Sequence, residues 1–274
     1  MTDRASASSR WMPFSDRHVV ITGASSGIGR ATAQCISAQA GRVTLLARRA
    51  ERLEALAASL GEGAAWHAVD VSDSEALIVA IDRAVAVNGP IDGLFLNAGT
   101  GGTFAPVESY PDSDFMHVMQ VNLLSAFRAI AHVLPMMKER GKGAILVIGS
   151  LASERGMANN AAYVASKHGL LGLARAVALE AAPFGVRCNC IVPGFIETEM
   201  FDALPDEAMS QLASRIPQGR TGRAEELAGV AAFLLSDAAS HVTGQSLAVD
   251  GGVLGTLSVQ ANAPSLARLT RRRS

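Results

Sequence analysis

Tyr163 and Lys167 have the side-chain types and the spacing for acid–base chemistry. Residues four positions apart share one face of a helix, so the two side chains would lie next to each other. An ammonium group beside a phenol stabilises the phenolate and lowers the pKa of the tyrosine toward neutrality. Such a phenol could donate a proton to a carbonyl oxygen or accept one from an alcohol.

A tyrosine and a lysine at this spacing can also be two helix residues that face solvent or a neighbouring element. The composition argues against coincidence, because the chain has two tyrosines, and its lysines are only Lys138, Lys142 and Lys167. Arginine is used everywhere else. A guanidinium group is too basic to exchange protons, whereas an ammonium group is a compact charge whose pKa shifts readily. We therefore interpret Tyr163 and Lys167 as a proton-transfer pair.

A glycine-rich turn near the start of the chain could bind a dinucleotide. Residues 22–29 read T-G-A-S-S-G-I-G, directly after an apolar segment and before a helical one. Glycines allow a tight turn and a close backbone approach, and the following helix N-terminus attracts a pyrophosphate. The spacing differs from the more common G-x-G-x-x-G, and an ordinary strand–turn–helix could also carry it. The cofactor contacts predicted in this turn are Gly23, Ser25, Ser26, Gly27, Ile28 and Gly29.

The end of the second predicted strand bears on the choice between NAD and NADP. An acidic side chain there would bind the ribose 2′-hydroxyl, but the sequence has Arg48 and Arg49 and no acid. An arginine can pair with a 2′-phosphate through a charge-assisted fork. We therefore expect NADP(H) to be preferred over NAD(H); the alternative is that both arginines simply begin the next helix. Asp70, after the third strand, could accept a hydrogen bond from the adenine amino group or anchor its own loop.

Length and composition predict one α/β domain. The chain has 274 residues, is 49% hydrophobic and 18% charged, and carries a formal net charge of −1. This balance gives no reason to expect nucleic acid or an anionic membrane surface as a partner. No apolar run is as long as a membrane span, and residues 1–17 lack the apolar core of a secretory signal. Cys35, Cys188 and Cys190 match neither a disulfide framework nor a zinc site, so we expect a cytoplasmic protein without a metal.

Short apolar segments alternate with longer stretches of helical periodicity. Strands are predicted at 18–22, 42–47, 65–69, 93–97, 144–149, 186–192 and 246–249. Helices are predicted at 28–40, 50–60, 74–87, 112–140, 161–182 and 224–235. This alternation predicts a Rossmann fold, a three-layer doubly wound parallel sheet of about seven strands with helices on both faces. Ligands bind such sheets at the carboxyl ends of the strands, where the motifs collect.

The ordered motifs resemble the short-chain dehydrogenase/reductase superfamily, in its compact single-domain branch. They are T-G-A-S-S-G-I-G, D-V at 70–71, N-A-G at 97–99, Asn122, Ser150, Y-V-A-S-K at 163–167, P-G at 193–194 and G-Q-S-L-A-V-D-G-G at 244–252. Gly149 stands where a second serine is common and Leu96 where an asparagine is frequent, and neither departure removes a reacting group. The resemblance implies an N-terminal extension at 1–16, a single dinucleotide-binding and catalytic domain at 17–252, and a tail at 253–274 with a basic run at 271–273.

The resemblance implies a catalytic tetrad of Asn122, Ser150, Tyr163 and Lys167. Tyr163 would be the general acid in reduction and the general base in oxidation, with Lys167 binding the nicotinamide ribose. Ser150 would bind the substrate oxygen. Asn122 would hold a water in a proton relay, although an asparagine inside a helix can also simply satisfy nearby backbone groups. The further cofactor contacts that the resemblance implies are Val71, Asn97, Ala98, Gly99, Tyr163, Lys167, Pro193, Gly194, Ile196 and Thr198.

The resemblance thus implies an oxidoreductase that transfers a hydride between NADP(H) and a carbonyl or secondary alcohol. A ketone or 3-oxoacyl reductase, similar to 3-oxoacyl-(acyl carrier protein) reductases, is the reading we favour. Alternatives are an NAD(H)-dependent secondary alcohol or polyol dehydrogenase, and a non-catalytic dinucleotide-binding regulator. A weaker alternative is an epimerase or dehydratase of the longer branch. The glycine spacing and the larger C-terminal substrate region of that branch are absent here.

An apolar small-molecule substrate and a homo-oligomer complete these expectations. Apolar residues that could form a substrate wall, or the inner face of a lid helix, are Met157, Phe195, Met200, Phe201, Leu204, Met209 and Leu212. The family is usually tetrameric and pairs through its long helices, here at 112–140 and 161–182, and through the C-terminal strand. We therefore expect a homotetramer or homodimer.

Overall fold

The structure, a computed structural model, describes residues 13–199 and 205–256 of the chain. Most of the predicted N-terminal extension, the basic run at 271–273 and three residues of the expected apolar wall, Met200, Phe201 and Leu204, lie outside the described residues. Phe14, which belongs to the predicted extension, is buried in the core beside Ile36 and Gly41.

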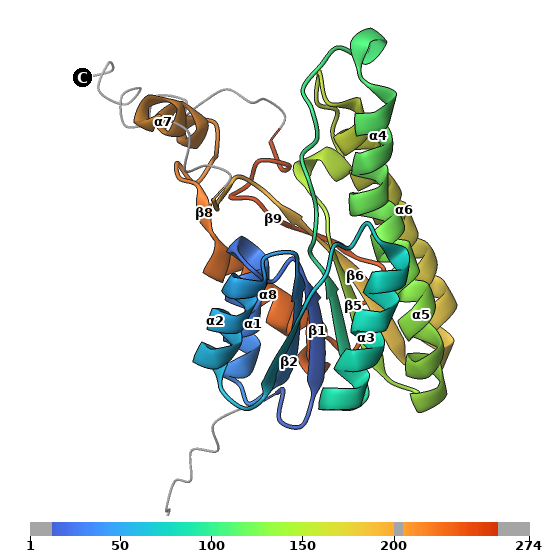
Figure 1. The fold of residues 1–274 in the computed structure, drawn as a ribbon. Coiled ribbons are helices and arrows are strands. Elements are labelled where there is room, and N and C mark those ends of the chain that lie inside the picture. Colours follow the sequence, from blue (N-terminus) through green and yellow to red (C-terminus); the bar gives the residue numbers. More distant parts are fainter. Residues whose placement is uncertain (1–12, 200–204, 257–274) are drawn as a thin grey trace, which may run out of the picture.

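Seven parallel strands form the central sheet in the order β3-β2-β1-β4-β5-β6-β9 (Figure 1). The strands are β1 His18–Thr22, β2 Arg42–Ala47, β3 Ala64–Ala68, β4 Gly93–Leu96, β5 Gly143–Ile148, β6 Val186–Pro193 and β9 Ser246–Val249. The predicted parallel, doubly wound sheet is confirmed, and each strand lies within one residue of its predicted ends. The strand order changes direction between β1 and β4, and the crevice outside the carboxyl ends of such strands is where ligands bind.

Helices cover both faces of the sheet, so the fold has three layers (Figure 1). The longer helices are α1 Gly27–Ser37, α2 Ala50–Leu60, α3 Ser74–Asn88, α4 Asp112–Met119, α5 Ser125–Arg140, α6 Ala161–Ala181, α7 Asp206–Ser214 and α8 Ala224–Leu235. Alternate strand residues point to opposite faces. Val20 therefore packs with α3, α5 and α6, whereas Val19 and Ile21 pack with α1, α2 and α8. None of the described helices is long and apolar enough to cross a lipid bilayer.

The prediction of one regular helix at 112–140 is wrong in its middle. The helical path is continuous, but a π-helical turn, Gln120–Leu124, separates α4 from α5. A π turn holds more residues than an α turn and occurs mostly as a single turn, often at a functional site. Asn122 lies in this turn, and its side chain is buried.

The segment between β6 and α8 contains two short strands that we did not predict, and a helix where one of our alternatives placed a lid helix. Two short strands, β7 Ile196–Glu197 and β8 Gly222–Arg223, pair in parallel outside the main sheet. The helix α7 follows β7 and stands away from the sheet layers (Figure 1). This segment leaves the carboxyl end of β6, so it begins at the edge where the ligand-binding motifs collect.

Candidate active site

Tyr163 and Lys167 lie one turn apart near the N-terminus of α6. Asn160 caps this helix by accepting a hydrogen bond from the Tyr163 backbone N–H at 3.3 Å. Lys167 is 3% exposed, and its Nζ lies 5.6 Å from the centroid of the Tyr163 ring. The same Nζ donates a hydrogen bond of 2.8 Å to the carbonyl of Ile148 at the carboxyl end of β5. The buried ammonium group therefore connects the phenol to the sheet edge.

Ser150 follows β5 directly and begins a short 3-10 turn, Leu151–Ser153. Its Oγ accepts a hydrogen bond from the Ala152 backbone N–H at 3.2 Å, and its own N–H donates to Ser153 Oγ at 3.1 Å. This reciprocal capping fixes the position of the hydroxyl. Because the Oγ contact is one that it accepts, the hydroxyl proton remains free to be donated.

Asn122 connects three elements around Lys167. Its Oδ1 accepts from the Thr100 backbone N–H at 2.8 Å, and its Nδ2 donates to the Thr100 carbonyl at 2.9 Å and to Ser166 Oγ at 3.0 Å. A Cβ on Gly99 would lie 3.3 Å from Asn122 Oδ1 and 3.6 Å from Lys167 Nζ. Asn122 and Lys167 therefore border the same small space, and the amide satisfies nearby backbone groups, as one of the sequence readings foresaw.

The glycine turn between β1 and α1 forms a bare cradle. Gly23 and Gly27 have φ values of 66° and 51°, a region that strongly favours glycine. A Cβ on Gly29 would lie 2.5 Å from the Gly23 carbonyl oxygen and 2.6 Å from Asn97 Nδ2. Asn97 braces the turn by donating to the carbonyls of Thr22 and Gly23 at 3.1 and 3.2 Å. Ser26 is the N-cap residue that precedes α1, and its side chain makes no cap bond to the first turn, so the N–H groups of that turn remain available to an anion.

The two arginines after β2 have different surroundings. Arg49 donates to Ser25 Oγ at 2.9 and 3.1 Å and to Ser26 Oγ at 2.6 Å, so its guanidinium group lies against the glycine turn. Arg48 is largely exposed, and its Nη1 lies 4.0 Å from Asp70 Oδ2. Asp70 accepts hydrogen bonds from the Ser72 N–H and hydroxyl, and the backbone bond holds the pKa of Asp70 below its usual value. Asp70 therefore anchors its loop, one of the two roles expected from the sequence.

The remaining predicted contacts lie along the same carboxyl edge. The N–H groups of Asn97 and Ala98 both donate to Thr22 Oγ1, which joins the ends of β1 and β4. Gly194 N–H donates to the Val249 carbonyl at 3.0 Å, and a Cβ there would lie 2.6 Å from the Cα of Asp250. Other predicted residues differ in environment: Val71 and Ile196 are buried, Ile28 is partly buried, and Pro193 ends β6.

Thr198 lies against the glycine turn. A Cβ on Gly27 would be 3.1 Å from Thr198 Cγ2, so the chain after β7 reaches the start of α1. The sequence did not single out Asn160, Ser166 or Thr100 as contributors to this site. A helix-start pattern could have found Asn160, because asparagine is a preferred N-cap residue. Ser166 and Thr100 act through tertiary hydrogen bonds to Asn122, which no local pattern reports.

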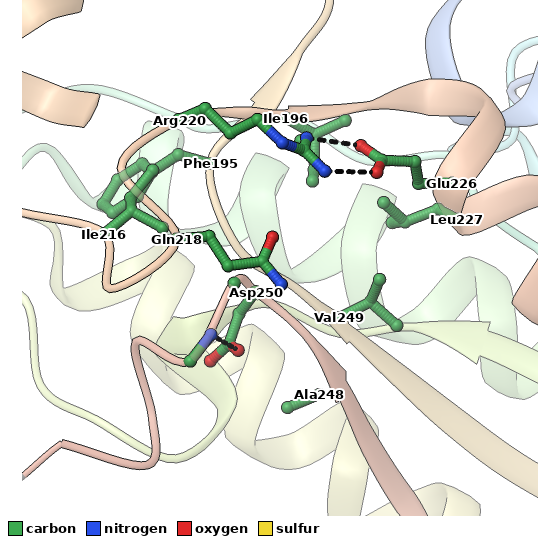
Figure 2. Close-up of a pocket in the computed structure, with 13 residues that line it drawn as sticks. Phe195, Ile196, Ile216, Gln218, Arg220, Glu226, Leu227, Ala248, Val249 and Asp250 are labelled. Carbon is green, nitrogen blue, oxygen red and sulfur yellow. Dashed lines mark hydrogen bonds and ion pairs between the residues drawn. The ribbon is translucent and has the colours of Figure 1, made fainter.

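The pocket in Figure 2 lies beside this site and has a volume of about 370 Å³. The chain after β6 and the end of β9 line it, and Phe195 faces it. Arg220 forms an ion pair with Glu226 across one wall, which lowers the pKa of Glu226 to about 2. None of the four predicted catalytic residues lines this pocket, so Phe195 does not share a wall with Tyr163 there. Of the other expected wall residues, Met157 is exposed, and Met209 and Leu212 on α7 are half-buried.

The known proteins that this chain resembles in sequence include dehydrogenases and reductases. A family model described as enoyl-(acyl carrier protein) reductase matches residues 23–254. Cis-4-hydroxycyclohexanecarboxylate dehydrogenase of Sinomonas cyclohexanicum is 38% identical over 87% of this chain and 97% of its own length. Levodione reductase of Leifsonia aquatica is 37% identical over 92% and 98%. The 3-oxoacyl-(acyl-carrier-protein) reductase FabG of Escherichia coli (strain K12) is 34% identical over 88% and 99%.

The solved structures that this chain resembles also include reductases and dehydrogenases. The crystal structure of levodione reductase superposes with a TM-score of 0.84 at 37% identity, over 87% of this chain and 98% of that chain. The structure of an NAD+-bound xylitol dehydrogenase superposes with a TM-score of 0.81 at 34% identity, over 87% and 99%. These similarities extend over nearly the whole length of each known protein.

Proposed function

Because the chain belongs to the short-chain dehydrogenase/reductase family and is an oxidoreductase of that family, we propose that it reduces a ketone or 3-oxoacyl group with NADPH. The observation that carries this proposal is the buried Lys167 ammonium group beside the Tyr163 phenol, at the sheet edge that also holds the glycine turn. The proton donor and the bound dinucleotide can therefore reach the same substrate. The same residues would run the reaction in the direction of alcohol oxidation.

The cradle fits a nicotinamide dinucleotide. A Cβ on Gly23 or Gly29 would collide with neighbouring atoms, and Gly27 has a positive φ, so all three leave the backbone bare; the N-terminus of α1 presents free N–H groups to a pyrophosphate. Arg49, held on Ser25 and Ser26, supplies a fork for a 2′-phosphate. The cofactor, when bound, supplies or accepts the hydride. We assign its contacts to the predicted residues of this edge, with Arg48 and Arg49 at the adenosine end and Thr198 near the pyrophosphate.

Tyr163 carries the proton in our proposal. In reduction its hydroxyl protonates the substrate oxygen, and in oxidation it removes that proton. The Lys167 charge, 5.6 Å from the ring centroid, stabilises the negative charge that the phenol gains when it loses the proton. Ser150 donates a hydrogen bond to the substrate oxygen, because its own acceptor contact leaves its proton free.

Asn122 acts mainly as a positioning residue in this scheme. Both N–H bonds of its amide go to protein partners, so its side chain has no N–H left to hold a relay water. A relay from Lys167 to solvent would pass through the second lone pair of Asn122 Oδ1 or through the backbone of its π turn. The amide joins the loop after β4 to helix α6, which carries Lys167.

The substrate proposal is supported by the relatives' names, which include a hydroxycyclohexanecarboxylate, levodione and a 3-oxoacyl group. The NAD+-bound xylitol dehydrogenase favours the alternative, an NAD(H)-dependent secondary alcohol or polyol dehydrogenase. A screen of NADPH and NADH oxidation over cyclic ketones, 3-oxoacyl thioesters and aromatic aldehydes tests both. We expect turnover with a ketone or 3-oxoacyl thioester and a lower KM for NADPH. A clear preference for NADH, with activity on polyols in the reverse direction, would replace our proposal by the alternative.

Two further features support a homotetramer or homodimer in the cytoplasm. Apolar side chains are exposed on α4–α6 and on α8 and β9, and Leu179 on α6 is 79% exposed. The others are Met116, Leu124, Phe127, Phe233 and Leu247. Exposed apolar patches mark association surfaces.

The proposed cytoplasmic location is supported by the cysteines. Cys35, Cys188 and Cys190 are free thiols, which fits a reducing compartment.

A further inference from the structure

Glu199 bridges two arginines at the adenosine end of the cradle. Its Oε2 accepts a hydrogen bond of 2.8 Å from Arg49 Nη1, and its Oε1 pairs with Arg52 Nη1. The two hydrogen bonds, that from Arg49 first, hold the pKa of the Glu199 carboxyl below its usual value, so the group is ionised near neutral pH. Glu199 comes from the chain after β7, whereas both arginines lie at the start of α2 and some 150 residues earlier.

Arg49, one of the two bridged cations, belongs to the proposed cofactor site, and Arg52 reaches that site through Glu199. Arg49 simultaneously donates to the hydroxyls of Ser25 and Ser26, which places its guanidinium group on the glycine turn. Neither Arg48 nor Arg49 is preceded by an acid on β2, so the anion that satisfies Arg49 comes from elsewhere in the chain. A carboxylate of the protein thus holds the donors that would bind a ribose 2′-phosphate.

We propose that Glu199 is a specificity-determining residue, an internal anion that competes with the 2′-phosphate of NADP(H) for Arg49 and Arg52. This inference rests on the proposed cofactor site. A 2′-phosphate brings more negative charge than one carboxylate and replaces it on both guanidinium groups. NAD(H) brings no such group, so Glu199 stays paired when that cofactor binds. The carboxylate therefore reduces the margin by which the site prefers NADP(H).

The position of Thr198 gives this exchange a second consequence. Thr198 lies against Gly27, at the start of α1, and directly precedes Glu199. Ile196 and Glu197 are held by their pairing with β8, whereas the ion pairs of Glu199 hold Thr198 and Glu199 near the glycine turn, so release of the ion pairs loosens these two residues. Replacement of the Glu199 carboxylate by a 2′-phosphate would therefore also change how firmly Thr198 and Glu199 are held.

The test is Glu199→Gln, with Glu207→Gln as the matched control. Glu207 is exposed on α7 and forms no ion pair among the described residues, so its substitution removes the same charge without touching Arg49. Both Glu199 ion pairs are solvent-exposed, so their loss should tighten NADPH binding by about two- to tenfold. NADH binding should change by less than about twofold, because no phosphate competes.

Fluorescence titration of both cofactors onto the full chain measures the ratio of the two dissociation constants. A ratio that moves toward NADPH in Glu199→Gln alone supports the competition. An unchanged ratio overturns it, and so does weaker NADH binding, which would make Glu199 a direct ribose ligand. If the wild type binds NADH better than NADPH, the proposed NADP(H) preference fails, yet the shift in the ratio still decides the role of Glu199.

Hydrogen exchange without any cofactor gives an independent readout. The backbone amides of Thr198 and Glu199 should exchange faster in Glu199→Gln than in the wild type or in Glu207→Gln. Equal exchange rates in all three proteins would contradict the claim that the ion pairs hold this stretch on the turn.

Discussion

At the scale of single residues, the proposed chemistry depends on the position of one buried charge. Lys167 is nearly inaccessible, and its ammonium group is bound by a backbone carbonyl of β5 rather than by a carboxylate. A buried cation without an anionic partner is costly unless hydrogen bonds compensate it. The hydrogen bond to the Ile148 carbonyl supplies part of this compensation but no negative charge, so the ammonium group near the Tyr163 ring can favour a negative charge on the phenol.

Removal of the Tyr163 hydroxyl should therefore separate catalysis from binding. We expect Tyr163→Phe to lower kcat by about 10²-fold or more, since general acid–base catalysis typically contributes that much. The dissociation constant for NADPH should stay within about threefold, because the glycine turn and Arg49 are untouched. Steady-state NADPH oxidation and fluorescence titration measure the two quantities.

The chain offers a matched control for this substitution. Tyr110 is its other tyrosine, and the Tyr110 hydroxyl is buried without a hydrogen-bond partner among the described residues. Tyr110→Phe removes the same atom from a site outside the proposed tetrad and should keep kcat within about twofold of the wild type. Tyr163 would lose its proposed role if both variants turned over at similar rates.

At the scale of elements, the hydrophobic pattern predicted the buried strands and long helices correctly, but it did not predict the short or irregular elements. Strands such as β1 and β5 are buried on both faces, so their boundaries coincide with apolar runs that any reader of the sequence can see. The π turn around Asn122 adds residues to a turn without interrupting the helical pattern, which is why we predicted one regular helix. The two-residue strands β7 and β8 are too short to show a period.

The placement of the candidate site residues was predictable where it depends on local spacing, and not where it depends on tertiary contacts. Lys167 and Tyr163 follow from helix spacing, and the glycine turn follows from its place between a strand and a helix. The pairing of Arg49 with Glu199 joins residues 150 positions apart through a loop, and no local pattern indicates it. Likewise, the hydrogen bonds of Asn122 to Thr100 and Ser166 become visible only once three elements are placed in space.

The close contacts in the glycine turn, which joins β1 to α1, predict the effect of adding a Cβ there. In Gly29→Ala the new Cβ would lie 2.5 Å from the Gly23 carbonyl oxygen, a backbone atom that cannot move without deforming the turn. We expect a loss of about 1–3 kcal/mol in the free energy of unfolding, the usual cost of overpacking. NADPH binding should weaken at least tenfold in fluorescence titrations, because the backbone approach to the pyrophosphate is lost.

Gly63→Ala is the control for this variant. Gly63 precedes β3, and a Cβ there would lie 3.6 Å from the nearest atom, an ordinary contact. Its stability in chemical denaturation should stay within about 0.5 kcal/mol of the wild type. If Gly29→Ala behaved the same way and still bound NADPH normally, the turn would not be the close-approach site that we propose.

At the scale of the whole molecule, the exposed apolar side chains predict how copies of the chain associate. Leu179 projects from α6, one of the helices that we propose for the interface, and most of its side chain is exposed. A glutamate there would place a charge in a desolvated interface, which is strongly unfavourable unless it is paired. We expect Leu179→Glu to reduce the mass measured by light scattering at micromolar concentration to half or a quarter of the wild-type value. Val87→Glu, an equally drastic change on the exposed side of α3, should leave the mass unchanged. A monomeric wild type, or a Leu179→Glu variant of unchanged mass, would show that α6 does not form the interface.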